Sequence, residues 1–242
     1  MPLLRASDGC EIAWKNGGGF TREIAAHPAG AGYEAFDWRV SLARIARDGP
    51  FSVFPGVDRL FAVVAGAGVE LAFEDAPPLR LDASAAPVRF AGEANVFVRL
   101  RDGEAVALNV MTRRGARLLD QRHRFKRSRV ERAAFRLRFG AQLLEMVIDK
   151  FRTRSALVGS GDGARRPRER AQLSFHEATS ALTLPGGSGT RLWIALAGTG
   201  RLEAAGLLEP FGPGDAWTGP GEATAVSLTA EAPLRLVRVD IV

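Results

Sequence analysis

Residues 14–24, WKNGGGFTREI, place an aromatic ring, an amine, an amide, three glycines, a hydroxyl, a guanidinium and a carboxylate within eleven positions. Glycines 17–19 let the backbone adopt positive φ, so the polar side chains on either side can turn toward one point. The alternative is a plain glycine turn between two strands. A second polar stretch, WRVSLARIARDGPFSVFPGVDR at 38–59, follows closely and favours a binding site.

The polar residues of these stretches suit an anionic small molecule. A guanidinium is a planar fork that matches a carboxylate. The candidate cations are Lys15, Arg22, Arg39 and Arg59, the candidate neutral hydrogen-bonding groups are Asn16, Thr21, Ser41, Ser52 and Asn109, and the candidate apolar wall is Trp14, Trp38, Phe51 and Phe54.

Alternation in the stretch WRVSLARI predicts which of its side chains act together. On a strand, Arg39, Ser41, Ala43 and Ile45 share one face, and Trp38, Val40, Leu42 and Arg44 share the other. Arg39 and Ser41 are therefore expected to point together into the mouth of a barrel. The alternative places Arg39 in solvent or in an ion pair with Glu23.

The sequence around these residues predicts short, closely spaced strands. From Trp38 to Met111, and again from 191 to the end, short apolar runs are broken by Gly, Pro and Asp. The stretches LFAVVAGAGVELAF at 60–73 and LWIALAGTGRLEAA at 192–205 form a weak internal repeat. Each predicts a tight glycine turn between antiparallel neighbours, and Pro213-Gly214-Asp215 predicts a further turn. This all-β pattern resembles the cupin β-barrel, and two copies indicate a bicupin.

The middle of the chain does not fit this pattern. Residues 113–170 carry 18 basic and 6 acidic side chains, a net charge of +12, whereas the rest of the chain carries 15 and 21, a net charge of −6. We predict a first barrel at 1–115, a basic helical or disordered connection at 116–172 with a helix near 141–152, and a second, partial barrel at 173–242. A true insertion, a divergent connection and an out-of-frame reading of GC-rich DNA all stay open for residues 116–172.

Several functional classes lack their signatures. The chain has no Gly-x-Ser-x-Gly elbow, Ser/His/Asp set or P-loop. Many cupins hold a metal through histidines ahead of the first glycine turn, but those positions here hold residues such as Pro55, Val57 and Arg59, so we expect neither metal nor cofactor. The only histidines are His27, His123 and His176, and we interpret them as surface or packing residues.

Partners and location follow from the same composition. The lone Cys10 excludes an internal disulfide and suits a reducing compartment. We see no signal peptide and no apolar run of about 18 residues, so we expect a cytoplasmic protein without a membrane span. A nucleic-acid-binding regulator that uses residues 113–170 is a lesser alternative, because that segment lacks aromatic residues spaced for base stacking.

Three motifs together resemble one family. WKNGGGFTREIA, FDWRVSLARIARDGPFSVFPGVDR and LNVMTRRG stand at 14–25, 36–59 and 108–115. In type, order and spacing they are similar to the HutD/Ves family, a bicupin group. The family commonly has an acidic residue before the Leu-Asn of the third motif, where this chain has Ala107.

The resemblance implies a metal-free bicupin that binds a small carboxylate, such as urocanate or formylglutamate, and regulates histidine utilisation. Its fold permits a homodimer. Carried over by motif, the ligand-binding positions are Lys15, Asn16, Thr21, Arg22, Glu23, Arg39, Ser41, Arg59, Asn109 and Met111, with none assigned as catalytic. The alternative is an enzyme of the same fold that transfers a proton through Glu23 or Lys15.

Overall fold

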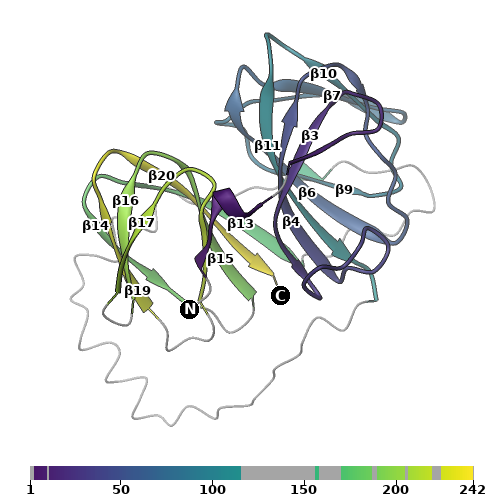
Figure 1. Cartoon of the computed structure of the whole chain (residues 1–242). Coiled ribbons are helices and arrows are strands. Elements are labelled where there is room, and N and C mark those ends of the chain that lie inside the picture. The colour runs from purple at the N-terminus through teal and green to yellow at the C-terminus, as the bar shows by residue number, and fades with distance from the viewer. Residues whose placement is uncertain are drawn as a thin grey trace, which may run out of the picture.

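The computed structural model describes residues 3–9, 11–115, 156–157, 170–186, 190–204, 207–219 and 225–241. The chain forms two all-β units, each built from a larger and a smaller sheet around its own apolar core (Figure 1). The helix expected near 141–152 lies outside the described residues. In the described part of the chain, no helix is long and apolar enough to cross a membrane.

The first unit contains a seven-stranded and a four-stranded sheet. The larger sheet has, in spatial order, β12 (Ala156–Leu157), β9 (Val88–Ala91), β6 (Val57–Gly66), β11 (Ala105–Arg113), β4 (Trp38–Ile45), β3 (Gly19–His27) and β2 (Glu11–Ala13). The smaller sheet has β5 (Gly49–Pro50), β10 (Val96–Leu100), β7 (Val69–Phe73) and β8 (Ala76–Leu81).

The second unit repeats this plan with a five-stranded and a four-stranded sheet. The larger sheet has β1 (Leu3–Leu4), β18 (Ala216–Thr218), β15 (Thr190–Ala197), β20 (Leu234–Ile241) and β13 (Ala171–Ala178). The smaller sheet has β14 (Ala181–Pro185), β19 (Ala225–Ala230), β16 (Gly200–Ala204) and β17 (Leu207–Phe211).

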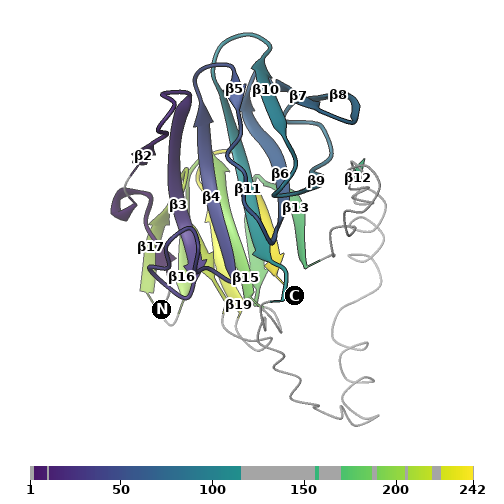
Figure 2. The ribbon, with the colours of Figure 1, turned by 90° about the vertical axis from the view of Figure 1, so that its right-hand side faces the viewer.

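The two larger sheets pack back to back (Figure 2). One apolar cluster contains Val40, Leu60 and Leu108 of the first unit together with Ile194 and Val237 of the second, all at most 2% exposed. The central strands of the seven-stranded sheet, β6 and β11, are therefore covered on both faces over most of their length. The opposite faces of the two larger sheets line the interiors of the two units.

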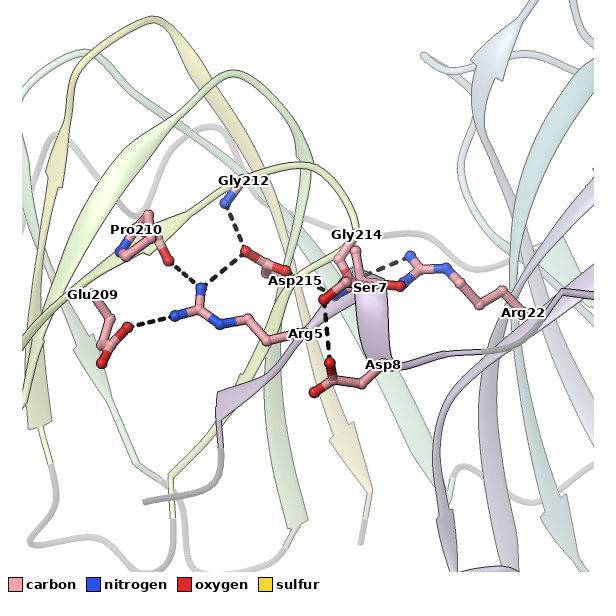
Figure 3. Close-up of polar contacts among 10 residues, drawn as sticks. Arg5, Ser7, Asp8, Arg22, Glu209, Pro210, Gly212, Gly214 and Asp215 are labelled. Atoms are coloured by element: carbon pink, nitrogen blue, oxygen red, sulfur yellow. Dashed lines mark hydrogen bonds and ion pairs between the residues drawn. The ribbon is translucent and has the colours of Figure 1, made fainter.

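The N-terminus ties the two units together, which differs from the predicted first barrel at 1–115. Strand β1 pairs with β18 of the second unit, and a short 3-10 helix at Ala6–Asp8 then leads to the first unit (Figure 3). Arg5 forms an ion pair with Glu209 at 2.6 Å, and the Ala6 amide donates to Asp215 at 2.8 Å. At the other boundary, β13 already begins at Ala171.

The predicted internal repeat is present, but its glycine turns are not hairpins. Strands β6 and β15 belong to the larger sheets, whereas β7 and β16 belong to the smaller ones, so each glycine turn is a corner between two sheets. Gly66 and Gly198 stand at these corners with φ of +89° and +80°. A Cβ at Gly198 would lie 2.1 Å from the Pro233 carbonyl oxygen, which leaves room for hydrogen alone.

Gly198→Ala should therefore lower the free energy of unfolding by more than a left-handed backbone conformation alone explains. At Gly17, where φ is +66° and no atom lies within 4 Å of a Cβ, an alanine should cost about 1–2 kcal/mol. Gly198→Ala should add about 1–3 kcal/mol for the forced backbone shift. Urea unfolding of both variants measures the difference, and equal losses would show that the corner is not tightly packed.

His176 predicts a second, pH-dependent property of the fold. Its ring packs 4.8 Å from that of Trp193 inside the second unit, and burial, aided by the charge of Arg238 and opposed by Asp240, lowers its pKa to about 4. The unfolded chain, with a pKa of about 6.5, takes up this proton first. Because of His176, the free energy of unfolding should therefore decrease as the pH falls from about 6.5 to about 4.

His176→Gln should reduce the drop in melting temperature between pH 7 and pH 4.5. His27→Gln is the matched control, because His27 is an exposed histidine, with 44% of its side chain accessible. The explanation fails if both variants keep the pH dependence of the unsubstituted protein.

Candidate functional site

The inner face of the seven-stranded sheet gathers most of the polar residues that the sequence predicts as a site. Strand β11 lies between β4 and β6, and Met111 stands directly opposite both Arg39 and Arg59. Asn109 stands opposite Ser41 and Phe61. Because side chains on one face of a sheet repeat every second residue, these positions form two adjacent rows on the same face.

Both arginines are almost fully buried on this face. Arg39 is 4% exposed, Arg59 6%, Asn109 6%, Ser41 1% and Met111 3%. Their strands are separated by β11, so the two Cα atoms lie roughly 10 Å apart, at twice the spacing of neighbouring strands. Long side chains at that separation can both reach a small group held between them.

Arg39 is neutralised within the protein. Its Nε donates to Glu23 Oε2 at 2.7 Å, and its Cζ lies 4.7 Å from the ring centre of Tyr33. Glu23 stands directly opposite Ser41 of β4, so strand alternation sets it on this face. The ion pair with Glu23, the alternative interpretation of Arg39, is thus present. Arg39 is nevertheless buried and does not face solvent.

Arg59 differs, since no carboxylate of the described residues lies within 4.0 Å of its guanidinium. Its Nε donates to Asn109 Oδ1 at 3.4 Å. Its Cζ lies 4.9 Å from the ring centres of both Phe51 and Phe90 and 5.9 Å from that of Phe54. Cation–π contacts with three rings compensate part of the lost hydration.

Burial lowers the pKa of Arg59 to about 9, which still leaves the guanidinium charged at neutral pH. A charge removed from water costs several kcal/mol unless it is paired. A negative group bound at Arg59 would therefore stabilise the buried charge. A carboxylate matches the planar fork of the guanidinium.

The structure does not bring every predicted residue to this face. Lys15 and Asn16 are exposed in a turn, where Asn16 Oδ1 accepts from the Gly18 amide at 3.0 Å. Arg22 lies on the opposite face and donates to the carbonyl oxygens of Ala6 and Gly214, so it joins the two units (Figure 3). Trp38 also lies on that face, packed against the cluster between the units.

Thr21 lies at the edge of the site. Its hydroxyl accepts from Trp14 Nε1 at 2.7 Å, and Trp14 packs edge-on against Phe51, which in turn contacts Arg59. Sequence reasoning missed Phe90 and Tyr33. Phe90 is found from the pairing of β6 with β9, which sets it opposite Arg59, while Tyr33 lies in a loop with no periodic signal.

The second unit has a polar cluster at the equivalent place, on the inner face of its larger sheet. Asp240 Oδ1 accepts from Arg191 Nε at 2.5 Å, and Asp240 Oδ2 lies 2.9 Å from Arg238 Nε. Arg238 also donates to Ser174 at 3.3 Å and lies 5.8 Å from the Trp193 ring centre. Among the described residues of both units, no three His, Cys, Asp or Glu side chains are grouped to hold a metal ion.

Comparisons with solved structures support the fold. A conserved protein of unknown function from Pseudomonas aeruginosa PAO1 has a TM-score of 0.67 at 24% identity, with 99% of this chain and 97% of that chain covered. HutD from Pseudomonas fluorescens SBW25, in a formate condition, has a TM-score of 0.60 at 23% identity over 100% and 98%. A cupin 2 conserved barrel domain protein from Leptotrichia buccalis has a TM-score of 0.51 at 12% identity over 96% and 92%. The chain is thus a cupin-like, nearly all-β protein.

Two curated proteins are similar in sequence over a shorter range. An uncharacterised 21.2 kDa protein of the hutC 3′ region of Pseudomonas putida is 40% identical over 114 residues, 46% of this chain and 57% of that protein. Protein Ves of Citrobacter koseri is 41% identical over 102 residues, 42% of this chain and 52% of that protein. The chain spans about half the length of the curated relatives it matches.

The family model described as HutD matches residues 6–201, which include the candidate site and both glycine corners. This range confirms the resemblance that the three sequence motifs suggested. The chain belongs to the HutD family.

Proposed function

We propose that the protein binds a small carboxylate of the urocanate or formylglutamate type at Arg59 and acts as a regulator of histidine utilisation. One observation carries the binding proposal: Arg59 is a buried guanidinium with no carboxylate partner among the described residues. Asn109 and Ser41 offer neutral hydrogen bonds beside it, and Phe51 and Phe90 offer apolar surface.

The family and the gene position of one relative support the regulatory part of the proposal. The Pseudomonas putida relative is named for its place in the 3′ region of hutC. A protein that binds a pathway carboxylate without consuming it can report the concentration of that carboxylate. A cytoplasmic site of action is part of this proposal.

Binding is favoured over catalysis by the positions of the two groups considered for proton transfer. Lys15 is exposed in the turn at 14–18, away from the inner face. Glu23 accepts from Arg39 at 2.7 Å, so its carboxylate is already engaged in an ion pair. Incubating the purified protein with each candidate carboxylate tests this choice. If the ligand binds and is recovered unchanged, catalysis on that ligand is excluded.

The binding proposal predicts ligand-dependent stabilisation that depends on Arg59. Urocanate, formylglutamate, glutamate, histidine and formate are compared by thermal shift and by calorimetric titration. At a hundredfold excess over its dissociation constant, the true ligand should raise the free energy of unfolding by about 2.7 kcal/mol. Arg59→Gln should abolish this gain.

Arg44→Gln is the matched control, because it also removes one arginine from the seven-stranded sheet, but this arginine lies on β4 and is an exposed side chain paired with Glu104. It should bind as the unsubstituted protein does. Equal loss of binding in both variants would mean that net charge, and not the buried guanidinium, attracts the ligand.

Without ligand, replacing Arg59 with an apolar residue should stabilise the protein. Arg59→Met removes a buried charge that lacks a carboxylate partner and keeps an apolar chain among Phe51, Phe54 and Phe90. We expect the ligand-free variant to be more stable by about 1–4 kcal/mol, the range found when buried ion pairs are replaced by packed apolar groups. Urea unfolding in a buffer without carboxylates measures this, and destabilisation would show that Arg59 is a structural residue.

A further inference from the structure

The internal repeat allows the two units to be compared residue by residue. Leu60 of β6 corresponds to Leu192 of β15, and Gly66 corresponds to Gly198. The strand orders agree as well, because β9, β6, β11 and β4 of the first unit follow one another as β18, β15, β20 and β13 do in the second. The pairing registers then fix which side chains occupy equivalent places.

The equivalent of Arg59 is Arg191, one residue before the matched leucine in each copy. Met111 stands opposite Arg59, and Asp240 stands opposite Arg191. The second unit thus has a carboxylate where the first unit has an uncharged methionine. Likewise Asn109, opposite Phe61, corresponds to Arg238, opposite Trp193.

The contacts of Asp240 are those of a bound carboxylate. One oxygen lies 2.5 Å from Arg191 and the other 2.9 Å from Arg238, so the group bridges two guanidiniums. Ser174 and the Trp193 ring also contact Arg238. In the first unit, Arg39 and Arg59 stand on either side of Met111. Among the described residues, Glu23 alone pairs an acid with these arginines, and it contacts Arg39.

We propose that the second unit is an anion site that the chain itself occupies, with the side chain of Asp240 in the place that a ligand carboxylate takes in the first unit. This inference rests on the proposed function for the first unit, where the ligand carboxylate would lie over Met111 between Arg39 and Arg59. The protein consequently binds one carboxylate per chain. Removing the internal carboxylate opens a second site for a small carboxylate at Arg191 and Arg238.

Calorimetric titration with sodium acetate and sodium formate tests this in two directions. Asp240→Asn keeps the shape of the side chain and removes its charge, so it should bind two anions per chain, the second lost on adding Arg238→Gln. Met111→Asp should place a carboxylate against Arg59 and abolish binding at the first site. Met111→Asn has the same shape without the charge, so the comparison isolates the effect of the carboxylate, and it should bind the anion more tightly than Met111→Asp does.

The outcomes separate this inference from the proposed function. If the unsubstituted protein binds no carboxylate but Asp240→Asn binds one, the proposed function of the first unit is wrong and the inference about the second stands. One anion in Asp240→Asn, with equal binding by Met111→Asp and Met111→Asn, overturns the inference while leaving the first site intact. Circular dichroism of each variant confirms folding, and if Asp240→Asn does not fold, the Met111 pair alone decides.

Discussion

The back-to-back packing of the two larger sheets is the constraint on which the rest of the molecule depends. It covers the outer faces of β4, β6 and β11 with apolar side chains of the second unit, such as Ile194 and Val237. Where these strands are covered on both faces, a polar residue on them is buried, whereas Arg44 near the end of β4 stays exposed. Arg39, Ser41, Arg59 and Asn109 are all placed on the inner face, where their charge and hydrogen bonds must be satisfied inside the unit.

The two units solve this problem differently. The second unit places a carboxylate, Asp240, against its two arginines. The first unit pairs Arg39 with Glu23 but surrounds Arg59 with aromatic rings. Such rings reduce the free-energy cost of burying a cation and leave its charge in place. A binding site for an anion requires this balance, because full neutralisation would leave nothing for the ligand to satisfy.

Much of this could be predicted from the sequence, because strand alternation is a local signal. It placed Arg39 and Ser41 on one face together, and the glycine repeat indicated two related units. Distant pairing could not be predicted in the same way. Local spacing does not reveal that β6 and β7 enter different sheets, or that β1 pairs with β18 more than 200 residues later.

Arg22 illustrates the same limit. It precedes Glu23 in a motif rich in polar residues, yet adjacent residues on a strand point to opposite faces. Whether the outward face meets solvent or a second unit depends on the whole fold, and here Arg22 meets the carbonyl oxygens of Ala6 and Gly214. Ala107, on the same strand as Asn109 and Met111, packs in the apolar core of the first unit.

A crystal structure of the protein soaked with 5-bromo-2-furoate, an unreactive aryl bromide whose bromine is located by anomalous scattering, tests ligand binding at Arg59 most directly. We predict a carboxylate within hydrogen-bonding distance of Arg59 on the inner face of the first unit, and no anion at Arg191 and Arg238. A bromofuroate carboxylate found elsewhere, with the Arg59 guanidinium left uncontacted, would contradict binding at this site.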